Sequence, residues 1–344
     1  MAYKRAGKLL QKYKIQIHIM ISVAMCTYNG AKFLPEQLKS IADQTVSVDE
    51  LVVCDDRSKD DTIEIIKSFA ATSKFRVRIH VNEQNLGSTR NFEKCLSLCE
   101  GDVIFLCDQD DRWRKDKVQK QLAFLNAHPN LDAVFSDADK IDDDSQPTGG
   151  TIWEEIEFNP SRQQLWHSGK SHEILFTGFV VTGATLAIRK SCLERLMPFP
   201  THVQDLIHDA WIAMVLSLEN KIEFIPEPLI SYRIHSSQQV GFGNKVEKVQ
   251  LADRFKRDRK LKLVPLEEKA NKLHELYLLL RALPFVPREK LHKLYLSQKH
   301  FYTRAALPES RFQRLTPVLS QLLRGYYRFS SKDWWLPAVG DLLE

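Results

Sequence analysis

Short apolar runs alternate with amphipathic stretches through the N-terminal part of the chain. The runs are too short and too rich in β-branched or aromatic residues for helices, so we expect strands at residues 15–26, 50–54, 75–81, 103–107 and 133–135. Between them apolar residues recur at helical spacing, so we expect helices at residues 35–43, 62–71, 89–99 and 115–127. This alternation predicts an α/β fold with a mostly parallel, doubly wound sheet.

The second part of the chain alternates less regularly. We expect an acidic loop over residues 137–150 and a helix over residues 206–218. Two further strands, residues 222–225 and 229–234, are expected on either side of a rigid turn at Pro226-Glu227-Pro228. Beyond Gly241 the pattern becomes helical. The chain is therefore predicted to contain an α/β domain over residues 1–240 and a mainly helical region over residues 241–344.

Two acidic clusters directly follow predicted strands. Asp55-Asp56 ends the second strand, and Asp108-Gln109-Asp110 ends the fourth. Open α/β sheets bind ligands at the carboxyl ends of their strands, and carboxylates are costly to desolvate unless a cation pairs with them. Alternate residues of a strand point the same way, so Asp108 and Asp110 can reach one hard cation, Mg²⁺ or Mn²⁺, that carries a phosphorylated ligand. The competing interpretation is an acidic turn that caps the next helix.

The first strand ends in Thr27-Tyr28-Asn29-Gly30, which offers a ring to stack on a base, an amide and a permissive glycine. Taken alone, this segment is also an ordinary turn from strand to helix. Asp55 and Asp56 can hydrogen-bond a base or a ribose. An Asx turn is nearly as good an interpretation for Asp55, and a weaker one for Asp56.

Five other residues carry candidate chemistry. His208-Asp209 begins a predicted helix, where it can supply a catalytic base or simply an N-cap. His235 follows a strand and can be a ligand or a surface residue. Arg90 can face a phosphate or water. Trp211 can contribute to a sugar platform, although most tryptophans pack in the core or at its rim.

Composition is ordinary, with 43% hydrophobic and 27% charged residues among 344. No stretch reaches transmembrane length and no signal-peptide cleavage pattern is present, so we expect a cytosolic protein. The six cysteines form no CxxC pair, which argues against structural zinc. The glycine patterns of dinucleotide-binding and P-loop sites are also missing from the sequence.

The net charge of +5 hides a division between the two predicted regions. From Gly241 onward, 21 Lys and Arg face 11 Asp and Glu, a net charge of +10, while the preceding residues carry a net charge of −5. Residues 254–260 and 324–329 mix cations with apolar side chains, and Trp334-Trp335-Leu336 adds an aromatic cluster. This composition suits an anionic membrane leaflet, and the alternative is a soluble helical subdomain or an oligomer contact.

Several of these motifs together resemble family 2 glycosyltransferases with the GT-A fold, of the nucleotide-diphospho-sugar transferase type. The resemblance spans roughly residues 18–240. It rests on residues 21–30, 51–62 (LVVCDDRSKDDT), 85–87, 101–113 (with DQDDRW), 182–185, 208–211 (HDAW) and 227–235 (EPLISYRIH). The last three elements look like the rhamnosyltransferase branch.

The resemblance implies a role for each matching residue. Thr27, Tyr28 and Asp56 would hold the nucleoside base, and Asp209 would be the general base. Asp108 and Asp110 would lie at the metal and the ribose–diphosphate, with Asp110 a direct ligand and His235 completing the metal or diphosphate site. The expected nucleotide-sugar site comprises Thr27, Tyr28, Asn29, Asp55, Asp56, Arg90, Asp108 and Gln109. The expected acceptor-side residues are Gly183, His208 and Trp211, and the expected metal ligands are Asp108, Asp110 and His235.

These residues predict an inverting, metal-dependent glycosyltransferase of bacterial surface glycan synthesis, using Mn²⁺ or Mg²⁺. The expected donor is a dTDP- or UDP-sugar, with rhamnose as the best single guess, and the acceptor is a glycan or a lipid-linked glycan. Peripheral contact with the inner face of the membrane is expected, and nucleic-acid binding is not. Two alternatives stay open: a non-catalytic scaffold with a relic site, and a sugar-nucleotide pyrophosphorylase.

Overall fold

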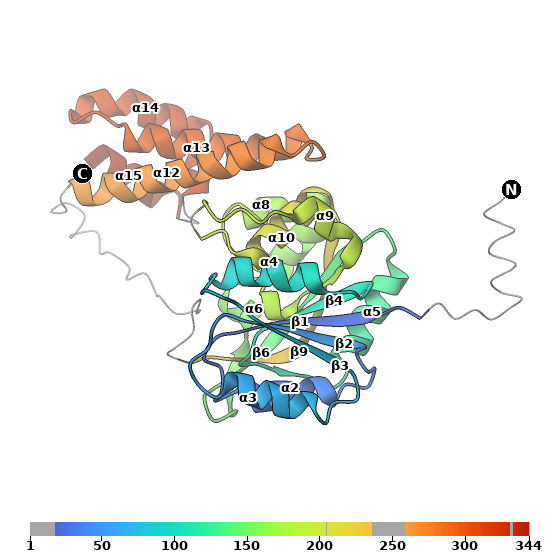
Figure 1. The fold of residues 1–344 in the computed structure, drawn as a ribbon. Coiled ribbons are helices and arrows are strands. Elements are labelled where there is room, and N and C mark those ends of the chain that lie inside the picture. Colours follow the sequence, from blue (N-terminus) through green and yellow to red (C-terminus); the bar gives the residue numbers. More distant parts are fainter. Residues whose placement is uncertain (1–17, 204, 236–258, 331–332, 344) are drawn as a thin grey trace, which may run out of the picture.

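A computed structural model describes residues 18–203, 205–235, 259–330 and 333–343 of the protein. A twisted central sheet lies between helical layers, and a further layer of helices covers one of these layers (Figure 1). The strands are β1 (Ile21–Thr27), β2 (Glu50–Asp55), β3 (Arg76–Val81), β4 (Val103–Cys107), β5 (Arg112–Trp113), β6 (Ala133–Ile141), β7 (Pro147–Thr151), β8 (Ala187–Arg189) and β9 (Ile222–Arg233).

The α-helices of the α/β part are α2 (Leu34–Ala42), α3 (Thr62–Ala70), α4 (Ser88–Leu98), α5 (Lys117–Ala127), α6 (Ile152–Glu155), α7 (Pro160–Leu165), α8 (Ser171–Leu175), α9 (Leu193–Leu196) and α10 (His208–Leu218). The short helices are η1 (Trp166–Lys170), η2 (Gly183–Thr185), η3 (Lys190–Cys192), η4 (Arg288–Leu291) and η5 (Tyr326–Phe329). The C-terminal α-helices are α12 (Arg259–Ala282), α13 (His292–Ala305), α14 (Arg311–Leu323) and α15 (Trp335–Leu343).

The described strands form one sheet in the order β3-β2-β1-β4-β8-β6-β9-β5, with β7 paired to β6. The half that contains β1, β2, β3 and β4 is parallel, as the strand–helix alternation predicts. The other half is mixed, because β8 runs antiparallel to both β4 and β6 while β9 runs parallel to β6. The predicted α/β class is confirmed, and the sheet contains more antiparallel pairing than the alternation suggested.

Alternate residues of the central strands feed two separate apolar cores. Ala24 and Ile104 pack on one face of the sheet against the layer that contains α4 and α10. Val23 and Phe105 pack on the other face, against the layer that contains α2 and α5. Because both faces are covered, the polar carboxyl ends of β1, β2 and β4 are the place where charged side chains can meet a ligand.

Two expectations about local structure are wrong. Residues 137–150 do not form a loop throughout, because β6 continues to Ile141 and β7 returns from Pro147 to make a hairpin. The segment Pro226-Glu227-Pro228 does not end a strand either, since β9 runs through it as one strand. Proline cannot donate to the ladder, and the register of β6 with β9 shifts between Ser136 and Ala138, opposite this segment.

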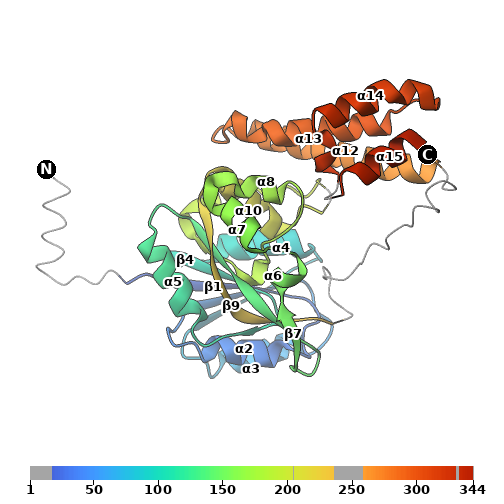
Figure 2. The ribbon, with the colours of Figure 1, turned by 180° about the vertical axis from the view of Figure 1, so that it is seen from behind.

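The predicted helical C-terminal region is confirmed for residues 259–330 and 333–343. Its helices α12 and α13 share the apolar core of the α4–α10 layer through residues that include Ala270, Leu280 and Phe301. Seen from behind, α14 and α15 lie farther from the central sheet than α8 and α10 do (Figure 2). The predicted boundary at residue 240 and most of the basic segment 254–260 fall outside the described residues. None of the described helices combines the length and the apolar character that crossing a bilayer requires.

Candidate active site

Three predicted carboxylates gather beyond the carboxyl end of β4. Asp108 follows β4 directly, Asp110 follows two residues later, and Asp209 lies in the first turn of α10. Desolvation, followed by the negative charges of Asp110 and Asp209, raises the pKa of Asp108 to about 8. The structure therefore brings residues from two distant segments into one acidic cluster, which favours a cationic ligand.

His235 and Asp110, two of the expected metal ligands, meet at this cluster. Their Nε2 and Oδ2 atoms lie 2.9 Å apart. The His235 ring also lies 5.0 Å from the Phe33 ring, centroid to centroid, which fixes it beside the loop before α2. Asp110 is held from behind as well, because the Nε of Arg233 donates to its backbone carbonyl at 2.8 Å.

The residues that precede α2 form the other wall of the site. The Gln109 amide pairs with the backbone of Tyr28 in both directions: its oxygen accepts from the Tyr28 N–H at 2.8 Å, and its nitrogen donates to the Tyr28 carbonyl at 3.1 Å. A Cβ at Gly30 would lie 2.2 Å from Gln109 Oε1, so a side chain there would force the Gln109 amide to leave this position. Tyr28 keeps 38% of its surface exposed, so its ring is available for stacking on a base. Asn29 is exposed, and its amide oxygen accepts from the Lys59 N–H at 2.8 Å.

Asp56 is held in a cradle of nitrogen donors. Its Oδ1 accepts from Asn82 Nδ2 at 2.8 Å and from the Leu86 N–H at 2.7 Å, and its Oδ2 accepts from the Gly87 N–H at 2.9 Å. The segment Asn85-Leu86-Gly87 therefore folds over the end of β2. Asp56 is largely buried, so this carboxylate is fixed in one orientation.

Asp55 and Thr27 lie inside the protein. Thr27 Oγ1 donates to Asp55 Oδ2 at 2.8 Å, and the Ser58 N–H donates to Asp55 Oδ1 at 2.8 Å. Asp55 is fully buried, and its carboxylate ties β1 and the loop after β2 together. This geometry matches the Asx-turn interpretation, so a direct contact of Asp55 with a ligand stays a prediction.

Asp209 is oriented by the backbone of η2. The Gly183 N–H donates to Asp209 Oδ2 at 2.8 Å, which holds this carboxylate in the first turn of α10. A Cβ at Gly183 would lie 2.9 Å from His208 Nε2 and 3.3 Å from Asp209 Oδ2, so a larger residue here would have to displace these side chains. His208 is buried and stacks on Phe92 with ring centroids 3.9 Å apart, which gives it a packing position beneath the loop.

Two predicted residues lie at the edge of this arrangement or below it. Trp211 is buried, and its indole N–H donates to the Leu196 carbonyl at 2.7 Å, so the structure gives it a packing role in the core. Arg90 is exposed on α4, where its Nη2 donates to Thr201 Oγ1 at 3.1 Å. A contact of Trp211 with an acceptor and a contact of Arg90 with a phosphate both stay predictions.

The donor set suits a hard divalent cation only in part. No three His, Cys, Asp or Glu side chains converge as a complete metal site within the residues that the structure describes. Asp110 and His235 are in contact. Asp108 lies close enough for the negative charge of Asp110 to raise its pKa. Magnesium is commonly bound by one or two carboxylates plus waters and substrate phosphates, so an incomplete protein cage fits this chemistry.

Sequence reasoning missed the residues that support this cluster from behind. Arg233 is fully buried and forms an ion pair with Glu36, with Nη2 and Oε2 2.6 Å apart. Asp111 is also fully buried and accepts from the Arg233 N–H at 3.0 Å. Burial, followed by the charges of Asp111 and Asp108, raises the pKa of Tyr232. The motif EPLISYRIH contains Tyr232 and Arg233, but nothing in its spacing shows which partners they contact.

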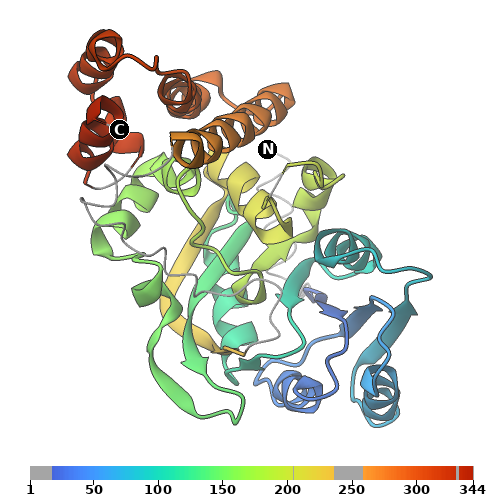
Figure 3. The same ribbon diagram turned by 90° about the vertical axis from the view of Figure 1, so that its left-hand side faces the viewer.

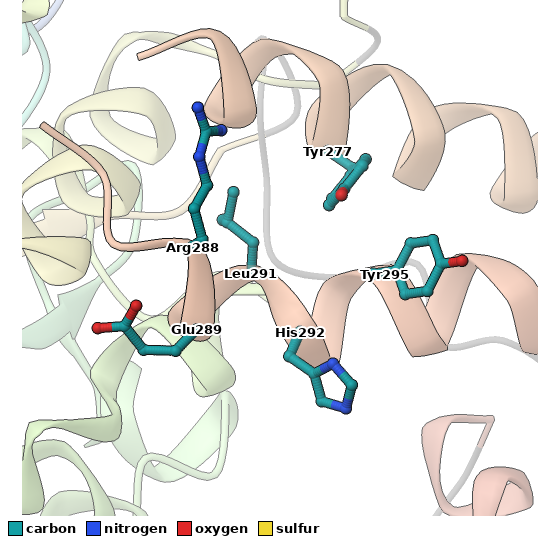
Figure 4. Close-up of a pocket in the computed structure, with 6 residues that line it drawn as sticks. All are labelled: Tyr277, Arg288, Glu289, Leu291, His292 and Tyr295. Atoms are coloured by element: carbon teal, nitrogen blue, oxygen red, sulfur yellow. The ribbon is translucent and has the colours of Figure 1, made fainter. Parts of the chain in front are cut away.

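A cavity of about 490 Å³ lies between α12 and α13, away from the strand ends (Figure 4). Its walls are Tyr277, Arg288, Glu289, Leu291, His292 and Tyr295. None of these is a predicted site residue, and the Tyr277 and Tyr295 rings lie 5.6 Å apart, centroid to centroid. The acidic cluster at the strand ends is therefore the better candidate for catalysis.

Comparison with solved structures shows the same fold. The chain is similar to residues 1–349 of TarS from S. aureus, with a TM-score of 0.57 and 15% identity over 94% of this chain and 90% of that one. It is also similar to the mannosyltransferase PcManGT from Pyrobaculum calidifontis, with a TM-score of 0.51 and 16% identity over 99% of this chain and 90% of that one. This likeness supports the GT-A arrangement of sheet and helices.

Sequence relatives agree with the structural likeness. EpsE of Bacillus subtilis, assigned as a glycosyltransferase, is 36% identical over 114 residues, which are 33% of this chain and 41% of EpsE. The uncharacterized glycosyltransferase MJ1057 of Methanocaldococcus jannaschii is 27% identical over 217 residues, 62% of this chain and 71% of MJ1057. TuaG of Bacillus subtilis, assigned as a glycosyltransferase of teichuronic acid biosynthesis, is 33% identical over 108 residues, 31% of this chain and 42% of TuaG. The chain thus spans less than half the length of EpsE and of TuaG.

A family model matches more of the chain than either Bacillus relative does. The model for "Glycosyl transferase family 2" matches residues 22–197, slightly more than half of the chain. The matched segment includes the strand-end residues Asp56, Asp108 and Asp110 as well as Gly183. The chain belongs to glycosyl transferase family 2 and has the GT-A fold.

Proposed function

We propose that the protein is an inverting, metal-dependent glycosyltransferase that moves a sugar from a nucleoside-diphosphate donor to a glycan or lipid-linked acceptor. The observation that carries the proposal is that the expected donor side and the expected general base lie together in one cluster. Asp108, Asp110 and His235 form the donor side, and Asp209 faces them from α10, near enough to raise the pKa of Asp108. A scaffold protein would have no need to hold these carboxylates so close together, where burial and mutual repulsion make them costly.

The donor side offers contacts for each part of a nucleotide. The exposed Tyr28 ring suits a base, and Asp56 and Asp108 offer oxygens to base N–H groups or ribose hydroxyls. Asp110 and His235, with Asp108 beside them, would hold Mg²⁺ or Mn²⁺ together with the diphosphate. A bound cation supplies Lewis-acid stabilisation of the negative charge that develops on the departing diphosphate.

Asp209 would act as the general base. Its Oδ2 is fixed by the Gly183 N–H, so the carboxylate is presented in one orientation to an acceptor hydroxyl. As the hydroxyl oxygen forms its bond to the anomeric carbon, Asp209 takes the proton, and the bond from that carbon to the diphosphate breaks. This single displacement inverts the anomeric centre, and general-base assistance of this kind is worth about 10²–10⁴-fold in rate.

The donor and the acceptor are proposed from the relatives and from the sequence motifs. Solved TarS complexes contain UDP or UDP-GlcNAc, and the PcManGT complex contains GDP-Man and Mn²⁺, which supports a nucleotide-sugar donor and a divalent cation. We propose a dTDP- or UDP-sugar, with rhamnose first, because the motifs around Asp209 and His235 resemble the rhamnosyltransferase branch. The name of TuaG supports a role in bacterial surface glycan synthesis. We also propose that the enzyme works in the cytoplasm at the inner face of the membrane.

The proposal is tested by nucleoside diphosphate release from a panel of sugar nucleotides with Mn²⁺, Mg²⁺ or EDTA. Turnover or slow hydrolysis of one donor that stops in EDTA is expected. A pyrophosphorylase would instead form a sugar nucleotide from a sugar phosphate and a nucleoside triphosphate, with release of pyrophosphate. If no donor in the panel binds or reacts with any metal, the scaffold alternative replaces the transferase.

A further inference from the structure

Helix α14 presents an apolar stripe to solvent. Phe312, Leu315, Leu319 and Leu323 recur every three or four residues, so they lie on one side of the helix. Their side chains are 86%, 44%, 50% and 89% exposed, while Val318 on another side is fully buried. Contiguous exposed apolar surface of this kind marks an interaction site, because single exposed apolar residues are common but an ordered stripe is not.

The chain around this stripe is basic. Between Ser310 and Ser330 the sequence contains no Asp or Glu, and Arg311, Arg324 and Arg328 are all exposed. The docking partner must therefore offer both an apolar interior and a negative surface. A second copy of α14 would bring a face of the same sign, which opposes association.

Two exposed tryptophans lie at the start of α15, toward one end of the stripe. Arg314 Nη1 donates to the Asp341 carbonyl at 3.3 Å, and Val318 packs in one cluster with Ala338, so α14 and α15 run antiparallel. The Leu323 end of α14 consequently lies toward the start of α15, where Trp334 and Trp335 are 43% and 48% exposed. Tryptophan is favoured at the boundary between lipid headgroups and acyl chains.

The helix that carries the stripe lies away from the sheet. Helix α14 lies at the outer side of the C-terminal helices in all three ribbon views (Figures 1, 2 and 3). A flat surface could therefore approach α14 without meeting the sheet or the layer that contains α10. The inner side of α14 is already occupied, because Val318 packs with Leu307 and Tyr327.

We infer that α14 docks the protein on an anionic lipid surface, with Phe312, Leu315, Leu319 and Leu323 inserted at the headgroup–acyl boundary and the flanking arginines on the headgroups. This inference names a surface for the membrane contact and does not depend on the reaction chemistry at Asp209. It locates the contact in α14 and the start of α15, whereas the sequence alone indicated only a basic C-terminal region.

The test compares two adjacent substitutions on the full chain. Phe312→Glu adds one negative charge on the stripe, and Gln313→Glu adds the same charge to the exposed neighbouring position outside it. We expect the wild type to sediment with vesicles that contain phosphatidylglycerol and not with pure phosphatidylcholine vesicles. Phe312→Glu should lower the partition coefficient by about tenfold or more, and Gln313→Glu by clearly less.

Each outcome decides the inference. The inference is overturned if the Phe312→Glu protein and the Gln313→Glu protein partition equally onto anionic vesicles. It is also overturned if the wild type does not bind these vesicles. A wild type that self-associates through this face, with Phe312→Glu restoring the monomer and no vesicle binding, also overturns it in favour of a second copy. Because Phe312 is exposed, thermal unfolding of the variant should match that of the wild type. Donor hydrolysis by the Phe312→Glu protein in detergent-free buffer should be unchanged, which separates this test from the test of the proposed reaction.

Discussion

Replacing Arg233 with Met should destabilise the protein through the loss of one buried guanidinium. In the wild type this group pairs with Glu36 Oε2 at 2.6 Å, donates to the Asp110 carbonyl at 2.8 Å and donates to the Asp142 carbonyl at 2.7 Å. It also lies 4.5 Å from the centroid of the Phe33 ring. It therefore connects the end of β9 to the loop after β4, to α2 and to the turn between β6 and β7.

The expected loss of stability depends on the burial of the Arg233 guanidinium and on the ion pair that Glu36 keeps after the substitution. Removing one partner of a buried ion pair costs about 3–5 kcal/mol. The Glu36 side chain is 34% exposed and keeps Arg112 at 3.1 Å, which partly compensates its charge. We therefore expect the free energy of unfolding of Arg233→Met to fall by about 3 kcal/mol, at the lower end of that range.

Urea unfolding followed by tryptophan fluorescence measures this loss. Arg112→Met is the matched control, because Arg112 pairs with the same Glu36 but is 40% exposed. That variant should lose no more than about 1 kcal/mol, as exposed ion pairs do. If the two variants are equally stable, the argument that Arg233 organises this loop is refuted.

Two further predictions concern the base and the pH dependence. Gly183→Ala should lower kcat by about tenfold or more, because the new Cβ displaces Asp209. The dissociation constant of the nucleoside diphosphate should change little. Equal losses in turnover and in nucleotide affinity would contradict this prediction. Burial lowers the pKa of His172 and of His300 to about 4, so the unfolded chain binds more protons between pH 6.5 and pH 4. The free energy of unfolding should therefore fall as the pH drops through that window, and His300→Gln should flatten the slope. An unchanged slope in His300→Gln would count against the buried-histidine account.

The part of the fold that local pattern dictates was predictable. Strands β1, β2 and β4 are mostly apolar, and the acidic residues at the ends of β2 and β4 mark the crevice without any knowledge of long-range contacts. Strand β9 was misread because Pro226 and Pro228 usually end a strand. Here the strand continues, because β9 pairs in parallel with β6 both before and after a shift in register.

The support behind the site could not be predicted, because its partners are far apart in the sequence. Arg233 and Glu36 are separated by 197 positions, and neither lies in a pattern that signals a buried ion pair. The same holds for Asn82, which donates to Asp56 from the end of β3. Residue types and spacing located the acidic cluster, whereas the contacts that orient it follow from tertiary packing alone.

The division of the site into a donor side and an acceptor side is tested most directly by binding and turnover measured on the same two variants. Calorimetric titration with UDP or dTDP in the presence of Mn²⁺, together with the turnover of the active donor, would compare Asp110→Asn with Asp209→Asn. We predict that Asp110→Asn loses both metal-dependent nucleotide binding and turnover. Asp209→Asn should keep the binding and lose turnover by about 10²–10⁴-fold. Normal nucleotide binding by Asp110→Asn, or a loss of binding in Asp209→Asn as large as in Asp110→Asn, would contradict the division.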